Sequence, residues 1–127
     1  MPIKSVRLRA ADGPPNVEIV IGQSQFGKYE VSLFDTDGRN PVVIGSGLSH
    51  DQAPDNFQID GNPATLHGRF ISWSANLIPM GNEANPQFSF RVHIRQRGVD
   101  VPGSPISNQG PLPGPRVEFD FVKMEVV

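Results

Sequence analysis

Apolar and polar residues alternate along much of the chain with a period of two. The clearest case is the segment 87–97, in which Phe88, Phe90, Val92 and Ile94 are separated by polar residues. Such alternation gives an extended strand one apolar face and one polar face. No stretch of useful length shows the three-and-four spacing of an amphipathic helix. We therefore expect an all-β protein with no long helix.

Eight segments carry this pattern, and residues that favour turns separate them. The predicted strands span residues 3–10, 17–21, 28–35, 41–45, 57–60, 66–78, 87–97 and 116–126. Asp37-Gly38 is the strongest hairpin signal, and Pro41 places the fourth strand at a sheet edge. The polar stretch 46–56 is expected to be a loop. Short strands at this spacing predict a single-domain antiparallel β-sandwich over residues 1–127, immunoglobulin-like or jelly-roll-like, with a closed barrel as the alternative.

The phase of each strand assigns the hydrophobic core. The predicted core consists of Val6, Leu8, Ile19, Ile21, Val31, Leu33, Ile71, Trp73, Phe90, Val92, Ile94 and Phe119. In the last strand, Val117 and Phe121 share the phase of Phe119, whereas Val122 and Met124 have the opposite phase. We therefore expect a β-bulge near residues 121–122, with Glu118 and Asp120 facing solvent.

The segment 102–115 holds five prolines and three glycines in fourteen residues. Because proline donates no backbone hydrogen bond, we expect a Pro/Gly-rich surface loop here and not a strand. Long loops in compact domains often bind ligands or partners. The candidate binding residues of this loop are Pro105, Ile106, Asn108, Pro111, Leu112 and Pro113.

Composition narrows the function further. The chain has no cysteine, which excludes disulfides, thiolate nucleophiles and cysteine-based zinc sites. A formal net charge of −2 favours neither nucleic acid nor an anionic membrane as a partner. The first residues carry charges where a cleavable signal peptide needs an apolar run, and no apolar run has membrane-spanning length. We expect a soluble protein and leave its compartment open.

No catalytic motif is evident. The Gly-x-Ser-x-Gly signature of a nucleophile elbow is missing, and the three histidines are scattered along the chain. We therefore expect a protein without enzymatic activity, and an unrecognised hydrolase remains an alternative. Arg91, His93, Arg95 and Arg97 form a basic row that would suit a polyanion. Pairing with acidic residues on neighbouring strands, such as Glu18, is the favoured interpretation.

A calcium site is the weaker of two ligand hypotheses. Asp35-Thr36-Asp37-Gly38 resembles the start of a calcium loop, but position 46 holds serine where the loop needs glutamate. With Asp51 and Asp55 from a second acidic segment, Asp35 and Asp37 form the candidate metal site. No other cofactor is expected.

Exposed aromatic residues suggest the function. Trp73 and Tyr29 are in phase with core residues, so they are not expected to stack on sugars. Phe34 and Phe70 are out of phase and are expected at the surface, where such residues commonly contact proteins. We expect a non-catalytic module that binds a protein partner or a second copy of itself. The alternative is a lectin-like carbohydrate-binding module, with or without calcium.

Overall fold

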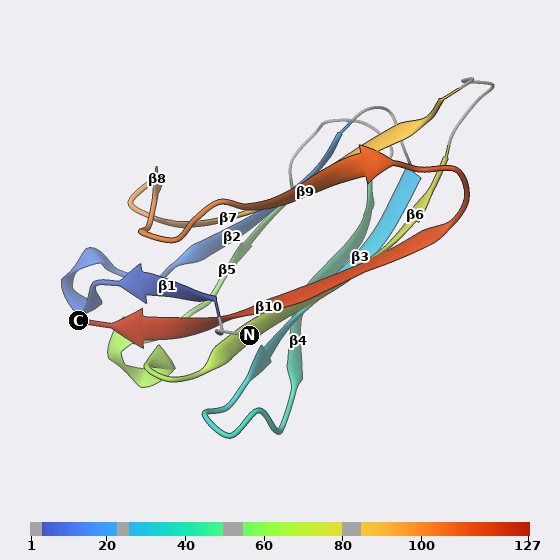
Figure 1. The fold of residues 1–127 in the computed structure, drawn as a ribbon. Helices are drawn as coiled ribbons and strands as arrows, with labels where there is room; N and C mark the ends of the chain where they lie inside the picture. The colour runs from blue at the N-terminus through green and yellow to red at the C-terminus, as the bar shows by residue number, and fades with distance from the viewer. Residues whose placement is uncertain (1–3, 23–25, 50–54, 80–84) are drawn as a thin grey trace.

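Two β-sheets face each other in the computed structural model, which describes residues 4–22, 26–49, 55–79 and 85–127 (Figure 1). The first sheet runs in the order β1 (Ser5–Leu8), β10 (Arg116–Val126), β6 (Phe70–Ile78), β3 (Phe26–Phe34) and β4 (Val42–Ser49). The second runs β5 (Asp55–Gln58), β2 (Asn16–Gly22), β7 (Gln87–Gln96) and β8 (Val99–Asp100), with β9 (Ile106–Pro111) also on β7. The predicted all-β sandwich is confirmed.

Most strand pairs are antiparallel, as expected, but β1 runs parallel to β10. The helical segments in the described residues are two short 3₁₀ turns, Ala10–Asp12 and Pro63–Leu66. The second turn replaces the start of the predicted strand 66–78, so β6 begins at Phe70. Pro63, the first residue of this 3₁₀ turn, has no backbone N–H to donate, which suits the first position of a helical turn.

The core is one cluster between the two sheets. Eleven of the twelve predicted core residues belong to it, all except Phe119. Trp73 on β6 lies opposite Val31 of β3 in the ladder, and both are buried. Tyr29 is buried as well, so the expectation that Trp73 and Tyr29 are core residues is confirmed.

The first half of β10, residues 116–121, has the opposite phase to the one predicted, whereas Val122 and Met124 lie inward as the predicted switch implied. The pairing of β10 with β6 is unbroken from Arg116 to Lys123, so the expected bulge is absent from this ladder. Val122 and Met124 are fully buried, and alternation then turns Phe119 outward, where it is 62% exposed. The register shift lies in the β3–β4 pair instead, next to Val31.

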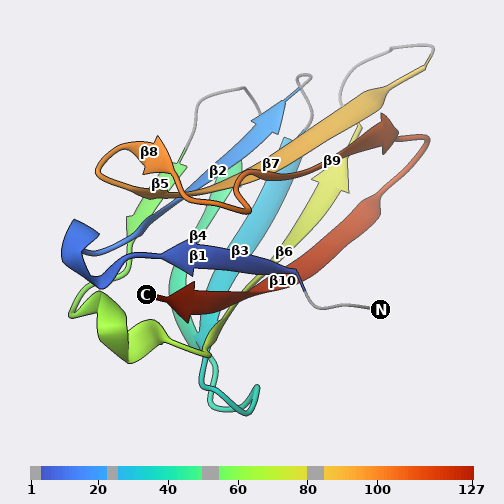
Figure 2. The same cartoon turned by 60° about the vertical axis from the view of Figure 1, so that its left-hand side comes forward.

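The phase of β10 turns Glu118 inward, and polar partners for this carboxylate make that possible. Glu118, predicted to face solvent, is only 8% exposed. It accepts a hydrogen bond of 2.8 Å from Asn108 of β9 and another from Arg116. The Arg116 guanidinium carbon lies 5.0 Å from the centre of the Phe88 ring. These contacts satisfy a buried carboxylate. The bond between Glu118 and Asn108 also connects the two sheets, because β10 belongs to the first sheet and β9, which precedes it in the chain, belongs to the second (Figure 2).

The prediction that 102–115 contains no strand is wrong. Residues 106–110 hold no proline and pair with β7, and β9 is a sheet edge, where proline at a strand end is tolerated. The preceding segment packs on β1, since the amide of Arg7 donates to the carbonyl of Pro102 at 3.0 Å. A side chain on Gly103 would meet the Ser5 carbonyl.

The predicted loop 46–56 is also too long. β4 continues to Ser49, and β5 begins at Asp55. Two glycines explain the longer strand: a Cβ at Gly45 would overlap the Phe57 ring, and one at Gly47 would overlap Tyr29. The aromatic side chains occupy the space that these glycines leave. The edge position predicted for this strand is confirmed.

Replacing Trp73 with alanine should remove a large part of the core. We expect a loss of about 3–5 kcal/mol in the free energy of unfolding, because the indole is buried and leaves a cavity. Urea denaturation followed by circular dichroism measures this. Val99→Ala is the control, since Val99 is 66% exposed on β8 and should change the free energy by less than about 0.5 kcal/mol. A loss below about 1 kcal/mol for Trp73→Ala would contradict the packing described here.

Candidate functional site

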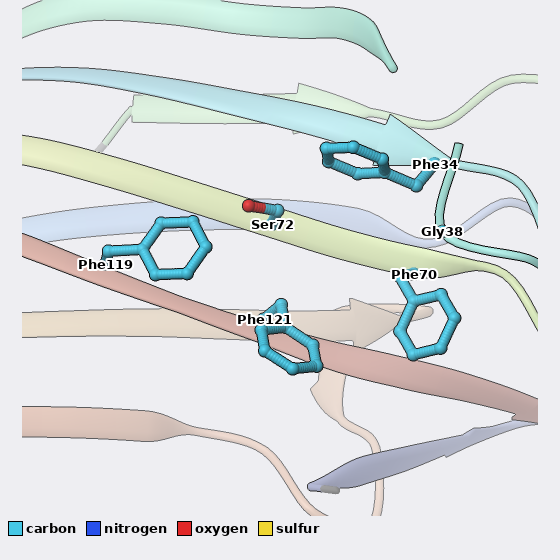
Figure 3. A pocket seen from close by; sticks show the side chains of 6 residues that line it. All are labelled: Phe34, Gly38, Phe70, Ser72, Phe119 and Phe121. Atoms are coloured by element: carbon cyan, nitrogen blue, oxygen red, sulfur yellow. The ribbon is translucent and has the colours of Figure 1, made fainter. Parts of the chain in front are cut away.

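Four phenylalanines gather on the solvent-facing side of the first sheet. Phe34 ends β3, Phe70 begins β6, and Phe119 and Phe121 belong to β10 (Figure 3). We call these four residues the phenylalanine patch. Phe34 and Phe70 are direct partners in the ladder, so the two residues predicted from phase to be exposed lie side by side. Both are half-buried within the patch.

The patch surrounds a recess of about 260 Å³. The ring centres of Phe70 and Phe121 are 5.9 Å apart in an edge-to-face arrangement, and those of Phe119 and Phe121 are 6.4 Å apart. Ser72 lines the recess from the outer side of β6, yet it is only 9% exposed. The neighbouring rings therefore shield a polar residue on the outer face.

The apolar surface extends beyond the patch. Val43, Leu48, Ile78 and Val117 are each more than two-fifths exposed. Their ladder partners place them on the same outer face as the patch: Val43 lies opposite Ser32, Leu48 opposite Lys28, Val117 opposite Asn76, and Ile78 continues the outward phase of Ser72. A soluble domain does not commonly carry so many large apolar side chains on one face unless another molecule covers them.

Phe119 and Phe121 were missed by the sequence reasoning. Lys123 and Glu125 share their phase and are a signal for an outward face, but Glu118 and Asp120 give the contrary signal in the other phase. The burial of Val122 and Met124 in an unbroken ladder, together with partners for those two carboxylates, decides between the phases. Asp120 pairs with Lys4, and Glu118 pairs as described above.

The residues predicted for the loop 102–115 do not join the patch. Leu112 is fully buried, Ile106 packs against the core and Asn108 binds Glu118. The three prolines, Pro105, Pro111 and Pro113, are exposed. They lie on or next to β9, which belongs to the second sheet. These six residues are therefore structural or lie away from Phe34 and Phe70.

The three candidate calcium ligands among the described residues are engaged in other contacts. Asp35 accepts from the amide of Arg39 at 3.0 Å and from the side chain of Asn40 at 2.6 Å, which are turn contacts of the β3–β4 hairpin. Asp37 accepts from the same amide at 3.2 Å. Asp55 accepts from the Tyr29 hydroxyl, and Asp51 lies outside the described residues. No group of three metal-binding side chains occurs in the part of the chain that the structure describes.

Hydrogen bonding also perturbs the titration of these groups. Contacts with Asp37 and Asn40 lower the pKa of Asp35 to about 2, whereas the shared contact with Asp35 raises the pKa of Asp37. Burial and the bond to Asp55 raise the pKa of Tyr29. These shifts follow from turn and core contacts.

The outer face of the second sheet is polar. Arg95 forms ion pairs with Glu18 on β2 and, at 3.6 Å, with Asp100 on β8, as the cross-strand hypothesis predicted for this arginine. Nδ1 of His93 lies 2.9 Å from Asp100. The Ser104 hydroxyl donates to Asp100 at 2.8 Å and not to His93, so this trio lacks the serine–histidine contact of nucleophilic catalysis.

The acid sensitivity of the fold should depend in part on Asp100. Burial alone would raise its pKa, but hydrogen bonds from Ser104 and His93 and the charge of Arg95 outweigh burial and lower it. A carboxylate with a lowered folded pKa stabilises the fold above its unfolded pKa, about 3.9, and loses this contribution as the pH falls through the folded value. We expect Asp100→Asn to reduce the stability at neutral pH and to flatten the acid limb of a plot of unfolding free energy against pH.

Ser104→Ala provides the second variant for this prediction. It removes one of the bonds to Asp100 and should shift the acid limb toward higher pH without abolishing it. An acid limb identical in all three proteins would show that Asp100 makes no such contribution.

The chain is thus two-sided, with an apolar outer face on one sheet and a charged one on the other. The described residues include no helix of the length and hydropathy needed to cross a membrane. Comparison of the chain with protein-family models, with curated proteins and with solved structures finds no match.

Proposed function

We propose that this chain is a non-catalytic β-sandwich module that binds protein through the outer face of its first sheet, centred on the phenylalanine patch. One observation carries the proposal: four aromatic rings surround a recess on the outer face of the first sheet, where solvent contacts them unless another molecule covers them. Aromatic side chains are enriched at the centres of protein interfaces, where they supply most of the binding energy.

The energetics support a contact surface over a structural role for these rings. Phe119 and Val117 are each more than three-fifths exposed, so they contribute little to the core. Covering apolar area releases about 25 cal/mol for each Å² removed from water. The outer face of the second sheet offers no comparable gain, because Arg95, Glu18 and Asp100 pair with one another there.

Edge-strand pairing is the less favoured mode of contact. β1 and β5 have only four residues each, and β4 carries the register shift. Pro105 precedes β9, and Pro111 ends it. Short strands, irregular pairing and proline are the features by which natural sheets discourage addition of another strand. The apolar face remains as the surface without such protection.

Carbohydrate binding is the second candidate, and a polar cleft on the other side of the molecule supports it. Asn16, Asn56, Gln58, Arg95 and Arg97 line a cleft of about 340 Å³ together with Pro14 and Gly98. Amide and guanidinium groups are suitable donors and acceptors for sugar hydroxyls. A glycan array with and without a chelator tests this candidate and its calcium dependence, with Asn56→Ala as the variant that should lose binding.

Site-specific photo-crosslinking tests the proposed function. A benzophenone side chain is placed at Phe119 of the chain in the cells that make it, and at Val99 as the equally exposed control. We expect discrete cross-linked protein products from position 119 that are absent from position 99. Such products would identify the covered face directly.

The opposite distribution would contradict the proposal. If position 119 gave no more protein cross-links than position 99, the phenylalanine patch would remain uncovered in the cell. Cross-links from both positions in equal amounts would indicate random encounters and would count against a specific surface.

A further inference from the structure

We infer that the partner of this face is a second copy of the chain, stacked on the first through the outer faces of β3, β6 and β10 in an isologous dimer. This inference rests on the proposed function. Three properties of the face support it: its relief, its charge balance and its area.

The relief of the face is complementary to itself. Phe119 and Phe121 form a ridge along β10, and Ser72 lines the recess beside it on β6 (Figure 3). Ser74, the next residue of β6 with the same phase, is also small and extends this trough. The ladder pairs Phe121 with Ser72 and Phe119 with Ser74, so ridge and trough are adjacent and equally long. Two copies can face each other about a two-fold axis that runs parallel to these two strands and midway between them. The ridge of each copy then lies over the trough of the other. An isologous interface requires such a patch, in which both complementary features belong to the same surface.

The charges around the ridge and trough are of both signs. Lys28 and Glu30 project outward from β3, Lys123 and Glu125 from β10, and Arg7 from β1 beside its ladder partner Glu125. A border of one sign would repel its own copy and would indicate an oppositely charged partner. A border with three basic and two acidic side chains carries little net charge, so it does not strongly repel a second copy.

The area of the whole outer face approaches what a stable dimer needs. Five strands of four to eleven residues, spaced by about 4.8 Å with a rise of about 3.3 Å per residue, give a face of roughly 650 Å² with the edge strands β1 and β4 included. Each partner in an interface of standard size buries about 800 Å². A contact centred on β3, β6 and β10 that also covered the edge strands would therefore come close to the area of such an interface.

Sedimentation velocity of the full chain over a wide concentration range tests the inference. We expect a species of twice the 13.8 kDa chain mass that dissociates on dilution. Phe119→Glu should weaken dimerisation by at least about tenfold, because a charge would replace the ridge. Phe119→Leu should retain the dimer, and Val99→Glu, an equal change on an exposed valine of β8, should leave it unchanged. Circular dichroism and thermal unfolding confirm that each variant is folded.

Ser72→Phe separates the stacked geometry from general hydrophobic association. This variant adds apolar area but fills the trough, so the ridge of the other copy has no place to insert. We expect weaker dimerisation for Ser72→Phe and unchanged dimerisation for Ser72→Ala. Tighter association of Ser72→Phe would overturn the proposed geometry.

A wild-type chain that remains monomeric at every concentration would overturn the dimer. The proposed function would survive that result if position 119 still formed cross-links to a different protein. It would fail with the dimer if position 119 formed no cross-links beyond those of position 99.

Discussion

The burial of Val122 and Met124 is the constraint from which the outer surface of this protein follows. Both side chains are fully buried, and the ladder between β10 and β6 continues without interruption along eight residue pairs. Because a strand alternates strictly, the positions of Phe119 and Phe121 are then directed outward. A single extra residue in β10 would have placed these rings in the core. Their exposure is the consequence of a regular ladder.

The same constraint turns two carboxylates inward, and partners from both sheets accommodate them. Glu118 is held by Asn108 and Arg116, and Asp120 is held by Lys4. Burial of a carboxylate is costly unless hydrogen bonds and an opposite charge compensate for it. The contact between Glu118 and Asn108 therefore connects the two sheets at the place where β1 no longer pairs with β10. The apolar outer face and the polar inner contacts are two results of one register.

The sequence permitted most of the fold to be predicted because alternation is a strong signal wherever one side of a strand is apolar. All eight predicted strands have a counterpart, and Phe34 and Phe70 were correctly placed at the surface. The pattern was ambiguous in residues 116–126, where each phase contains both apolar and charged residues. The proline content of 102–115 hid a strand, since prolines at 105 and 111 lie at the ends of β9 and not within it. Contacts between distant segments decided both cases, and a local pattern does not contain them.

The sidedness of the molecule has a consequence for how far an assembly would grow. Each chain carries one apolar sheet face, and the opposite face is occupied by paired charges such as Arg95 with Glu18. Association through a single self-complementary surface is closed and stops at two copies, whereas two different complementary surfaces would propagate into a fibre. A pair formed in this way would display two polar clefts on opposite sides of one rigid particle. Because the two clefts would face in opposite directions, the pair would bind groups on two separate ligands and connect those ligands to each other.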